Sequence, residues 1–578
     1  MRGRAHLRNH FCKRSSSNFR YMFEASMKNR FITLPVLMLA IVTIMSLLPF
    51  ITKSFNIDEP VYLWIARHIQ SNPLDFFGFK LNWYGIEMDV FSINKNPPFV
   101  PYYIALITGL FGWKETIIRI FFLVPAVGLS LGTYFLARSF CSSPHFAVML
   151  TIFSPVFLVS STNVTASTTM LAFYVWAIYL WLEGLKKESL PCLFISVIFI
   201  ALATLTKYFG ITLIPLLFVF TLVKKKRFDY RLCTLIIPVL LIISYEWLTY
   251  NLYNQGLFSD AAKYASERWV IKPSHILDQT LTGLSFTGGC LLGLTFFAPM
   301  LWPRRTLFLV TAILFVLSIF ILISMGTIGS VKLYDEMESL GYKAGVRWGL
   351  IFQLTLFISS GIHILILAIT DLMRHRDASS ILLFLWIIGT FLFTSYFNWT
   401  TSARNIFPML PAAAILVIRR INNSYKEPRS SKNWQVFWPL LPAALISFLV
   451  TWADFSLANS QRSAAYTIGN KLSDYKLPVT FQGHWGFQYY MEPLGYKAVD
   501  FRKEPSKGDI MIIPGNNTNT VWPNTDVFRL TGKIQEQPSG WLSVMKMGWS
   551  GFYSSVWGPL PFAVGEVSPE EFFVYMAE

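Results

Sequence analysis

The chain has 578 residues, of which 53% are hydrophobic and only 14% are charged. Soluble domains carry about 25% charged residues, so this composition excludes an ordinary soluble domain and indicates a polytopic membrane protein. The net charge of +17 resides in basic clusters between apolar runs, a pattern that follows the positive-inside rule and argues against nucleic acid as the partner.

The chain begins with a basic tail at residues 1–30, and an apolar run at residues 31–51 follows it. The run is too long for the core of a signal peptide and has no clear small-residue cleavage site, so it predicts an uncleaved anchor. The basic tail places the N-terminus in the cytoplasm. The first external loop is then predicted at residues 52–115, with an interfacial helix at 97–111.

Further apolar runs alternate with basic clusters as far as residue 452, so residues 31–452 form one predicted transmembrane domain. The sequence predicts a polytopic α-helical protein of the plasma (bacterial inner) membrane with about 13 transmembrane helices. The predicted spans are 31–51, 116–137, 146–160, 168–182, 190–205, 208–223, 232–250, 281–301, 307–325, 348–369, 381–397, 406–418 and 436–452.

The tail at residues 453–578 has a different pattern, with balanced charge, strand-like runs at 478–481 and 509–513, and turn signals at 514–517. We expect a small extracytoplasmic α/β domain there. None of the five cysteines lies in this tail, so no disulfide framework is indicated. The chain has no Walker A motif, no HExxH and no GxGxxG after a strand.

Two adjacent carboxylates, Asp58 and Glu59, stand at the external end of the first apolar run. Tyr62, Ile65 and Ile69 follow at helical spacing, which predicts a short amphipathic helix along the membrane surface. The acids then lie at the N-terminus of that helix. They form either a helix cap with a solvated neighbour or a functional site, because carboxylates at a membrane edge are costly unless solvated, paired or used.

Two cations are predicted on the same external side as Asp58. Lys207 lies between two apolar runs, and Arg404 precedes the span at residues 406–418. Each is either a snorkelling or anchoring side chain at a helix end or a binding group for an anionic phosphate. The span parity also places Asn163 on this side. Arg347, in a later external loop, is a weaker candidate.

Several short motifs in a fixed order resemble the GT-C superfamily of membrane glycosyltransferases. The chain is most similar to the bacterial branch related to protein O-mannosyltransferases and the lipid A aminoarabinose transferase, over roughly residues 31–411. The motifs are Asp58-Glu-Pro60, Asn96-Pro-Pro-Phe-Val-Pro-Tyr-Tyr103, Phe111-Gly-Trp-Lys-Glu-Thr-Ile-Ile-Arg119, Tyr134-Phe-Leu-Ala-Arg138, Leu205-Thr-Lys-Tyr-Phe209, and Arg404 before a Pro-x-x-Pro.

This resemblance implies a polyprenyl-phosphate sugar donor, and in some relatives a divalent metal ion. It assigns the role of catalytic base to Asp58 and a place at the donor phosphate to Lys207 and Arg404. The acceptor would be a glycan, lipid or protein, and membrane lipids would surround the protein. Glu59 would orient Asp58 or bind a metal.

The chain departs from the pattern of the relatives at two positions. The loop at residues 160–169 has no acid where many relatives carry one, and Lys95-Asn96 replaces a Glu-Lys pair before Pro-Pro. Both changes remove metal ligands, so the metal dependence stays unknown. Lys95, Asn96 and Arg347 remain candidate substrate contacts, and the tail motif at residues 483–490 resembles a segment of this branch to which we assign no chemistry.

The main hypothesis is a glycosyltransferase in which Asp58 deprotonates the acceptor hydroxyl and Lys207 with Arg404 stabilises the leaving phosphate. A transporter or flippase for lipid-linked sugars is one alternative. It would predict internal repeats and polar groups near span centres, which the sequence does not show clearly. A catalytically inactive relative that binds lipid-linked sugar is another, because the second acid is missing.

Overall fold

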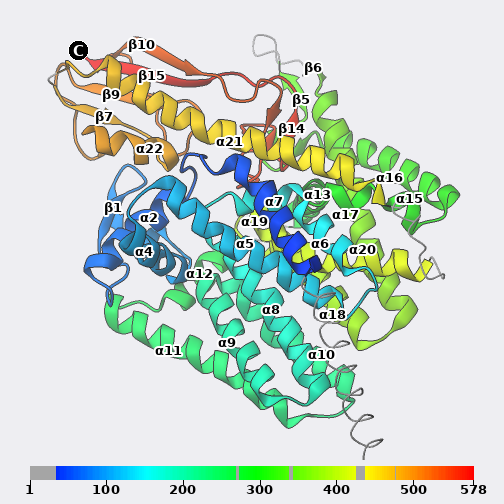
Figure 1. The fold of residues 1–578 in the computed structure, drawn as a ribbon. Helices are drawn as coiled ribbons and strands as arrows, with labels where there is room; N and C mark the ends of the chain where they lie inside the picture. The colour runs from blue at the N-terminus through cyan, green and yellow to red at the C-terminus, as the bar shows by residue number, and fades with distance from the viewer. Residues whose placement is uncertain (1–33, 268–272, 337–342, 425–436, 476) are drawn as a thin grey trace, which may run out of the picture.

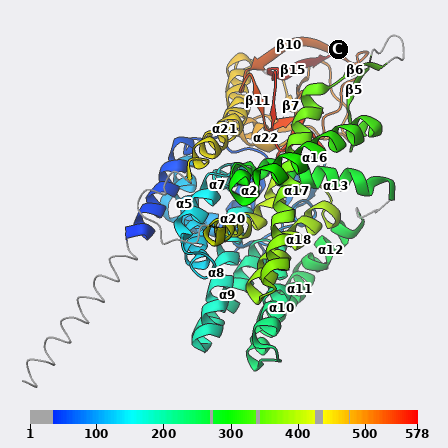
Figure 2. The same cartoon turned by 90° about the vertical axis from the view of Figure 1, so that its right-hand side faces the viewer.

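The computed structural model describes residues 34–267, 273–336, 343–424, 437–475 and 477–578. A body of helices makes up most of the molecule, and a smaller region of strands covers one end of it (Figure 1). Figure 2 shows this sheet region at one end, while α9 and α10 extend toward the opposite end.

The helices begin and end as follows: α2 Glu59–Ser71, α3 Val90–Ile93, α4 Phe99–Phe111, α5 Glu115–Ala137, α6 Pro144–Ile152, α7 Pro155–Ser161, α8 Ala166–Lys187, α9 Leu190–Thr206, α10 Leu213–Lys225, α11 Ile236–Tyr253, α12 Leu257–Glu267, α13 Pro273–Cys290, α14 Leu292–Thr295, α15 Ala298–Leu301, α16 Arg304–Met325, α17 Trp348–His375, α18 Ala378–Leu392, α19 Ala403–Ile406, α20 Leu410–Ser424, α21 Leu440–Lys471 and α22 Trp485–Met491. The strands are β1 Lys80–Asn82, β2 Glu87–Asp89, β3 Thr327–Ile328, β4 Val331–Lys332, β5 Tyr334–Glu336, β6 Lys343–Val346, β7 Val479–Phe481, β8 Lys497–Ala498, β9 Ile510–Pro514, β10 Phe528–Glu536, β11 Leu542–Ser543, β12 Met545–Lys546, β13 Ser550–Gly551, β14 Ala563–Val564 and β15 Glu570–Ala577.

Eight helices within the described ranges are long and apolar enough to cross a membrane, and the bent pair α6 and α7 raises the number to nine. The eight are α5, α8, α10, α11, α16, α17, α18 and α21, some of them extended by a short helical turn. Three shorter apolar helices, Leu34–Phe50, α4 and α9, complete the set. The predicted helix-rich membrane architecture is therefore confirmed, whereas the count of about 13 spans stays a prediction.

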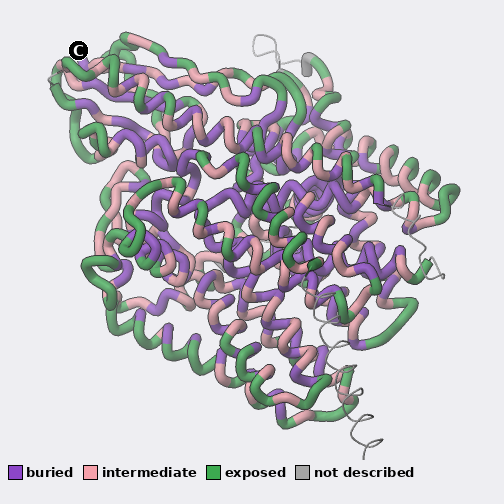
Figure 3. Tube along the Cα trace, viewed as in Figure 1, coloured by how far each residue is buried: buried purple, intermediate pink, exposed green. Residues whose placement is uncertain are grey.

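Exposed residues lie along the peripheral helices, while the interior of the body is buried (Figure 3). Many of the exposed residues are large and apolar. Helix α16 is the clearest example, because only 11% of its most apolar stretch of 18 residues is buried. Phe308, Ile313, Val316 and Phe320 project from it with most of their surface exposed. Exposed apolar residues of this kind suit a helix whose solvent is the lipid bilayer.

One predicted span, at residues 281–301, is not a single helix. Helix α13 ends at Cys290, and the short helices α14 and α15 follow it. A Cβ at Gly288 would lie only 1.9 Å from the carbonyl oxygen of Phe357, so the backbones of α13 and α17 touch here. Pro299 lies within the first two residues of α15, a position that proline favours at the start of a helix. The apolar run at residues 281–301 is therefore divided among several helices.

The sheet region contains a five-stranded sheet in the order β10-β15-β9-β7-β8. Neighbouring strands are antiparallel from β10 to β9, whereas β7 runs parallel to both β9 and β8. Strands β7 and β9 occupy the two strand-like runs expected from the sequence. The buried core beneath the sheet includes Ala464 and Ile468 of α21, Phe487 of α22 and Ile512 of β9.

Helix α21 joins the two parts of the molecule without a break. It has 32 residues, starts in the helical body and ends against the sheet (Figure 1). The predicted boundary between residues 452 and 453 falls inside this helix. We call residues 472–578 the C-terminal region.

Candidate active site

Asp58 is the residue immediately before α2, at the capping position. Its carboxylate makes no capping hydrogen bond, so the helix does not use it. Instead it accepts a hydrogen bond of 2.7 Å from Nη1 of Arg404 on α19, and 40% of the side chain is exposed. The residue before it, Ile57, has a φ of +52°, which is rare for a β-branched residue and marks local strain.

Lys207 lies in the break between α9 and the short 3₁₀ helix Tyr208–Thr212, and it approaches the same site. Its Nζ donates a hydrogen bond of 2.9 Å to Oδ1 of Asn405, the residue after Arg404. Burial and the positive charge of Arg404 lower the pKa of Lys207 to about 7, against the opposing effect of Asp58. The structure therefore brings Asp58, Lys207 and Arg404 together.

Tyr62 forms the buried side of this cluster, one turn along α2 from Asp58. Burial and the negative charge of Asp58 raise the pKa of its hydroxyl, which stays protonated as a hydrogen-bond donor. The Tyr62 hydroxyl also lies beside Asn96 and the backbone of Ala166. Asn96 is thus at the edge of the cluster, where the sequence analysis expected a substrate contact.

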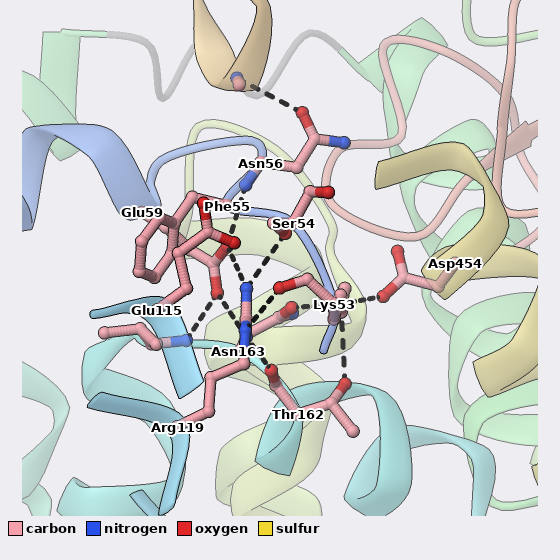
Figure 4. Close-up of polar contacts among 12 residues, drawn as sticks. Lys53, Ser54, Phe55, Asn56, Glu59, Glu115, Arg119, Thr162, Asn163 and Asp454 are labelled. Carbon is pink, nitrogen blue, oxygen red and sulfur yellow. Dashed lines mark hydrogen bonds and ion pairs between the residues drawn. The ribbon is translucent and has the colours of Figure 1, made fainter. Parts of the chain in front are cut away.

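Glu59, by contrast, points into the protein and is 1% exposed (Figure 4). Its Oε2 accepts the backbone N–H of Asn56 at 2.7 Å, and its Oε1 accepts that of Val164 at 2.6 Å. Both oxygens also accept from the guanidinium of Arg119, at 3.3 and 3.2 Å. The carboxylate of Glu59 is therefore occupied by the protein itself.

Arg119, on α5, uses all five of its N–H donors in this network. Two hydrogen bonds reach Glu59, and the others reach the backbone oxygens of Lys53, Ser54 and Thr162 (Figure 4). The guanidinium thereby ties the loop before Asp58 to α5 and to the end of α7. This arrangement fixes the backbone that carries Asp58.

A second buried ion pair lies just below that loop. Lys53 and Asp454 are 1% and 2% exposed, and the Lys53 ammonium contacts a carboxylate oxygen of Asp454. It also donates to Oδ1 of Asn163 and, at 3.4 Å, to Thr162. Because a buried charge is costly without a partner, the pair Lys53–Asp454 links the loop before α2 firmly to α21.

The C-terminal region reaches the same loop through α22. The backbone N–H of Gly486 donates to Oδ1 of Asn56 at 3.3 Å, and the backbone N–H of Phe55 donates to the Tyr490 hydroxyl at 2.8 Å. A Cβ at Gly486 would lie 2.3 Å from the Phe55 carbonyl oxygen, so only glycine permits this approach. The tail motif at residues 483–490 therefore docks on the loop that carries Asp58.

Two candidate residues have their partners elsewhere. The ammonium of Lys95 pairs with Asp260 of α12 at 2.5 Å. Arg347 donates to the backbone oxygens of Lys332 and Gly548 and lies over the ring of Trp549. Within the described ranges, neither contacts Asp58, Lys207 or Arg404.

Three buried charges of the site were missed by the sequence analysis: Lys53, Arg119 and Asp454. A signal existed for Arg119, because it is a charged residue on an otherwise apolar helix and belongs to one of the quoted motifs. Asp454 was assigned to the external tail because the predicted last span ended at residue 452.

The described residues around Asp58 do not form a metal site. Over the described parts of the chain, no group of three or more His, Cys, Asp or Glu side chains is arranged to hold one. Glu59, the acid nearest in sequence to Asp58, is engaged by Arg119. Asn163 stands in the loop where relatives were expected to carry a second acid, and its amide binds Lys53. We therefore derive no step through a metal.

Residues 95–250 match the family model described as dolichyl-phosphate-mannose-protein mannosyltransferase. This match confirms the expected resemblance to the GT-C membrane glycosyltransferases. A comparison with curated protein sequences gave no match.

Three solved structures are similar to the chain at low sequence identity. An Archaeoglobus fulgidus oligosaccharyltransferase tethered with an acceptor peptide is 15% identical with a TM-score of 0.45, over 80% of this chain and 63% of that chain. The same organism's AglB, in complex with an inhibitory peptide and a dolichol-phosphate, is 14% identical with a TM-score of 0.44, over 81% and 64%. ArnT from Cupriavidus metallidurans bound to undecaprenyl phosphate is 14% identical with a TM-score of 0.44, over 84% and 93%. The chain thus spans less than two thirds of the length of the archaeal enzymes.

Proposed function

We propose that this protein is a glycosyltransferase that moves a sugar from a polyprenyl-phosphate donor to an acceptor hydroxyl at the external face of the membrane. The observation that carries the proposal is the ion pair between Asp58 and Arg404, with Lys207 beside it. A partly exposed carboxylate next to two cations suits a base facing an anionic leaving group. The family match at residues 95–250 supports the same class of reaction.

In the proposed reaction, the donor phosphate binds between Lys207 and Arg404 and takes over the guanidinium that Asp58 holds in the free protein. Asp58 then accepts the proton of the acceptor hydroxyl, whose oxygen forms a bond to the anomeric carbon. The bond from that carbon to the phosphate oxygen breaks, and its electron pair leaves with the polyprenyl phosphate. Lys207 and Arg404 stabilise the charge that develops on the phosphate.

The remaining candidate residues receive different proposed roles. Glu59 positions the Asp58 loop through Arg119, because its oxygens already accept four hydrogen bonds. Asn96 contacts substrate beside Tyr62, whereas Lys95 and Arg347 secure helices and loops around the site. Each of these roles is testable by substitution.

The proposal includes a membrane topology. It places the cytoplasmic N-terminus, about 13 spans and an extracytoplasmic α/β domain in a bacterial inner membrane, in line with the basic clusters on one side of the spans. A sugar donor on a lipid phosphate needs no nucleotide outside the cell. This agrees with the absence of nucleotide motifs in the sequence.

The direct test is sugar transfer by purified protein in proteoliposomes containing a polyprenyl-phosphate sugar. Asp58→Asn keeps the shape of the side chain but removes the proton acceptor, which in general-base catalysis is worth roughly 10²–10⁴-fold in rate. We expect transfer to fall by about 100-fold or more with normal expression. Asp89→Asn is the matched control, because Asp89 also precedes a helix of the same loop without making a capping hydrogen bond. Wild-type transfer by Asp58→Asn would refute the role of Asp58.

A binding protein without transferase activity is the second candidate, and one observation favours it. The loop at residues 160–169 offers Asn163 where an acid was expected, and Asn163 is used by Lys53. Such a protein would bind undecaprenyl phosphate without transferring sugar from any lipid-linked donor. Movement of the donor across the bilayer without transfer would instead indicate a transporter.

A further inference from the structure

The C-terminal region places an aromatic ring directly against Arg404. The guanidinium carbon of Arg404 lies 5.4 Å from the ring centre of Tyr553, which is 5% exposed. Tyr553 belongs to the loop between β13 and β14, so it comes from a part of the chain about 150 residues beyond Arg404. A cation over an aromatic face is attracted to the ring, most strongly when water is excluded.

The Tyr553 ring is held in place by its hydroxyl group. The hydroxyl donates to Oδ1 of Asp454 at 2.8 Å and accepts from Nδ2 of Asn163 at 2.8 Å. Asp454 and Asn163 are themselves fixed by the ammonium of Lys53. The orientation of the ring is therefore set by the buried ion pair at the base of the first external loop.

The backbones on either side of this contact are also joined. The N–H of Ala403 donates to the oxygen of Phe552 at 2.8 Å, and the N–H of Ser555 donates to the oxygen of Thr401 at 2.8 Å. The Thr400 hydroxyl lies 2.9 Å from that of Ser554. Residues 400–404 and 552–555 thus form one continuous seam, and Arg404 stands at its end.

We propose that Tyr553 is a positioning residue that holds Arg404 in place for the donor phosphate, so that the C-terminal region is part of the donor site. This inference rests on the proposed function. In the free protein Asp58 restrains one side of the guanidinium, but Asp58 must be released for proton transfer. The ring of Tyr553 is a separate contact of the guanidinium and keeps Arg404 in position at that moment.

The test measures binding of undecaprenyl phosphate and the KM and kcat of transfer in full-length variants. Tyr553→Leu removes the ring, and we expect donor binding to weaken roughly 3–30-fold with KM affected more than kcat. Tyr553→Phe keeps the ring but loses the hydroxyl bonds that orient it, so its donor binding should lie between that of the wild type and that of Tyr553→Leu. Tyr475→Leu is the control for general damage to the C-terminal region, because the hydroxyl of Tyr475 bonds to Gly508 within that region.

The decisive comparison places Tyr553→Leu in an Arg404→Gln background. If Tyr553 acts through Arg404, Tyr553→Leu adds little to the loss of binding that Arg404→Gln already causes. Equal effects of Tyr553→Leu in both backgrounds, or equal binding by the Leu and Phe variants, would overturn the inference. Failure of the wild type to bind undecaprenyl phosphate would instead refute the proposed function, which keeps the two failures distinct.

Discussion

At the scale of single residues, the site is defined by a competition for Arg404. In the free protein its guanidinium binds Asp58 at 2.7 Å, whereas the proposed reaction needs Arg404 on the phosphate and Asp58 on the acceptor. The donor phosphate is a diester with one negative charge, like a carboxylate, but its oxygens can accept from Arg404 and Lys207 at the same time. Donor binding would therefore release the base, and the acceptor would be deprotonated only after the donor has arrived.

Lys207 gives this competition a pH dependence. Its pKa is lowered to about 7 by burial first and by Arg404 second. Below this pKa the side chain is protonated and attracts the donor phosphate, and above it the charge is lost. We expect the donor KM to rise roughly 10-fold or more from about pH 6 to about pH 9, as a charge-assisted hydrogen bond is lost.

Lys207→Arg provides the comparison, because an arginine stays charged over this range. The variant should bind donor less well at low pH, where its shape is wrong, but its KM should change little as the pH rises. Steady-state transfer assays across the pH series would measure both profiles. Parallel profiles for the two proteins would show that Lys207 does not carry the phosphate-binding charge.

Hydropathy and charge predicted which residues of the candidate site share one side of the membrane, but they did not predict every residue that these side chains contact. A common location for Asp58, Lys207 and Arg404 could be predicted, because span parity assigns all three to the same face of the membrane. The partner of Lys95 could not be predicted, because Asp260 is 165 residues away in a segment of no distinctive composition. Tyr553 gave no sequence signal at all, since buried aromatic residues occur throughout any core.

At the scale of secondary structure, the loop before α2 depends on Glu59 and Arg119. Arg119 reaches this loop from α5 with a fully used guanidinium, and Glu59 returns the contact from the first turn of α2. Both side chains are almost completely buried, at 3% and 1% exposure. The pair therefore joins α2 to α5, two helices that residues 72–114 separate in the sequence.

Arg119→Met should destabilise the protein strongly, because it leaves the Glu59 carboxylate buried without its counter-charge. Loss of one partner of a buried ion pair typically costs about 3–5 kcal/mol. The double variant Glu59→Gln with Arg119→Met should recover part of this loss, since no unpaired charge remains. Thermal unfolding in detergent, followed by loss of the monodisperse protein, would measure both.

Arg502→Met is the matched control for this experiment. Arg502 forms a well-aligned ion pair with Asp500, but its side chain is 61% exposed. Exposed pairs are screened by solvent and contribute little to stability, so the control should unfold close to the wild type. Equal losses for Arg119→Met and Arg502→Met would contradict the structural role assigned to the buried pair.

The predicted and observed helices agree best where apolar residues alone decide the outcome. The spans predicted at residues 116–137, 190–205 and 307–325 differ from α5, α9 and α16 by only a few residues at their ends. Helix α21 extends far beyond its predicted end, because its second half is buried against the sheet rather than in lipid. Hydropathy predicts which segments are buried in a membrane, but it does not predict that a helix continues because it packs against another part of the same chain.

At the scale of the whole molecule, α21 determines how the two parts are joined. Its 32 residues correspond to a rod of about 48 Å, longer than the roughly 30 Å hydrocarbon core of a bilayer. A helix that crosses the membrane must therefore project from it, and its projecting end carries the sheet. The site lies where this helix, the loop before α2 and α19 meet.

The proposed orientation predicts the behaviour of fusion reporters. A reporter that works only in the cytoplasm should be silent when fused after Glu578. The same reporter fused after the basic cluster at residues 224–227 should be active, because that cluster is predicted inside. Activity of both fusions in intact cells would place the C-terminal region in the cytoplasm and contradict the proposed topology.

The pairing of Lys53 with Asp454 has a consequence for how the protein is made. The two residues are 401 positions apart, so Lys53 leaves the ribosome long before its counter-charge exists. At synthesis rates of about 5–20 residues per second, the delay is roughly 20–80 s. During this time the ammonium group lacks its acidic partner and is costly to bury. Nascent chains that end before Asp454 therefore carry Lys53 without its counter-charge, and the contact between the loop before α2 and α21 forms only after nearly the whole chain has been made.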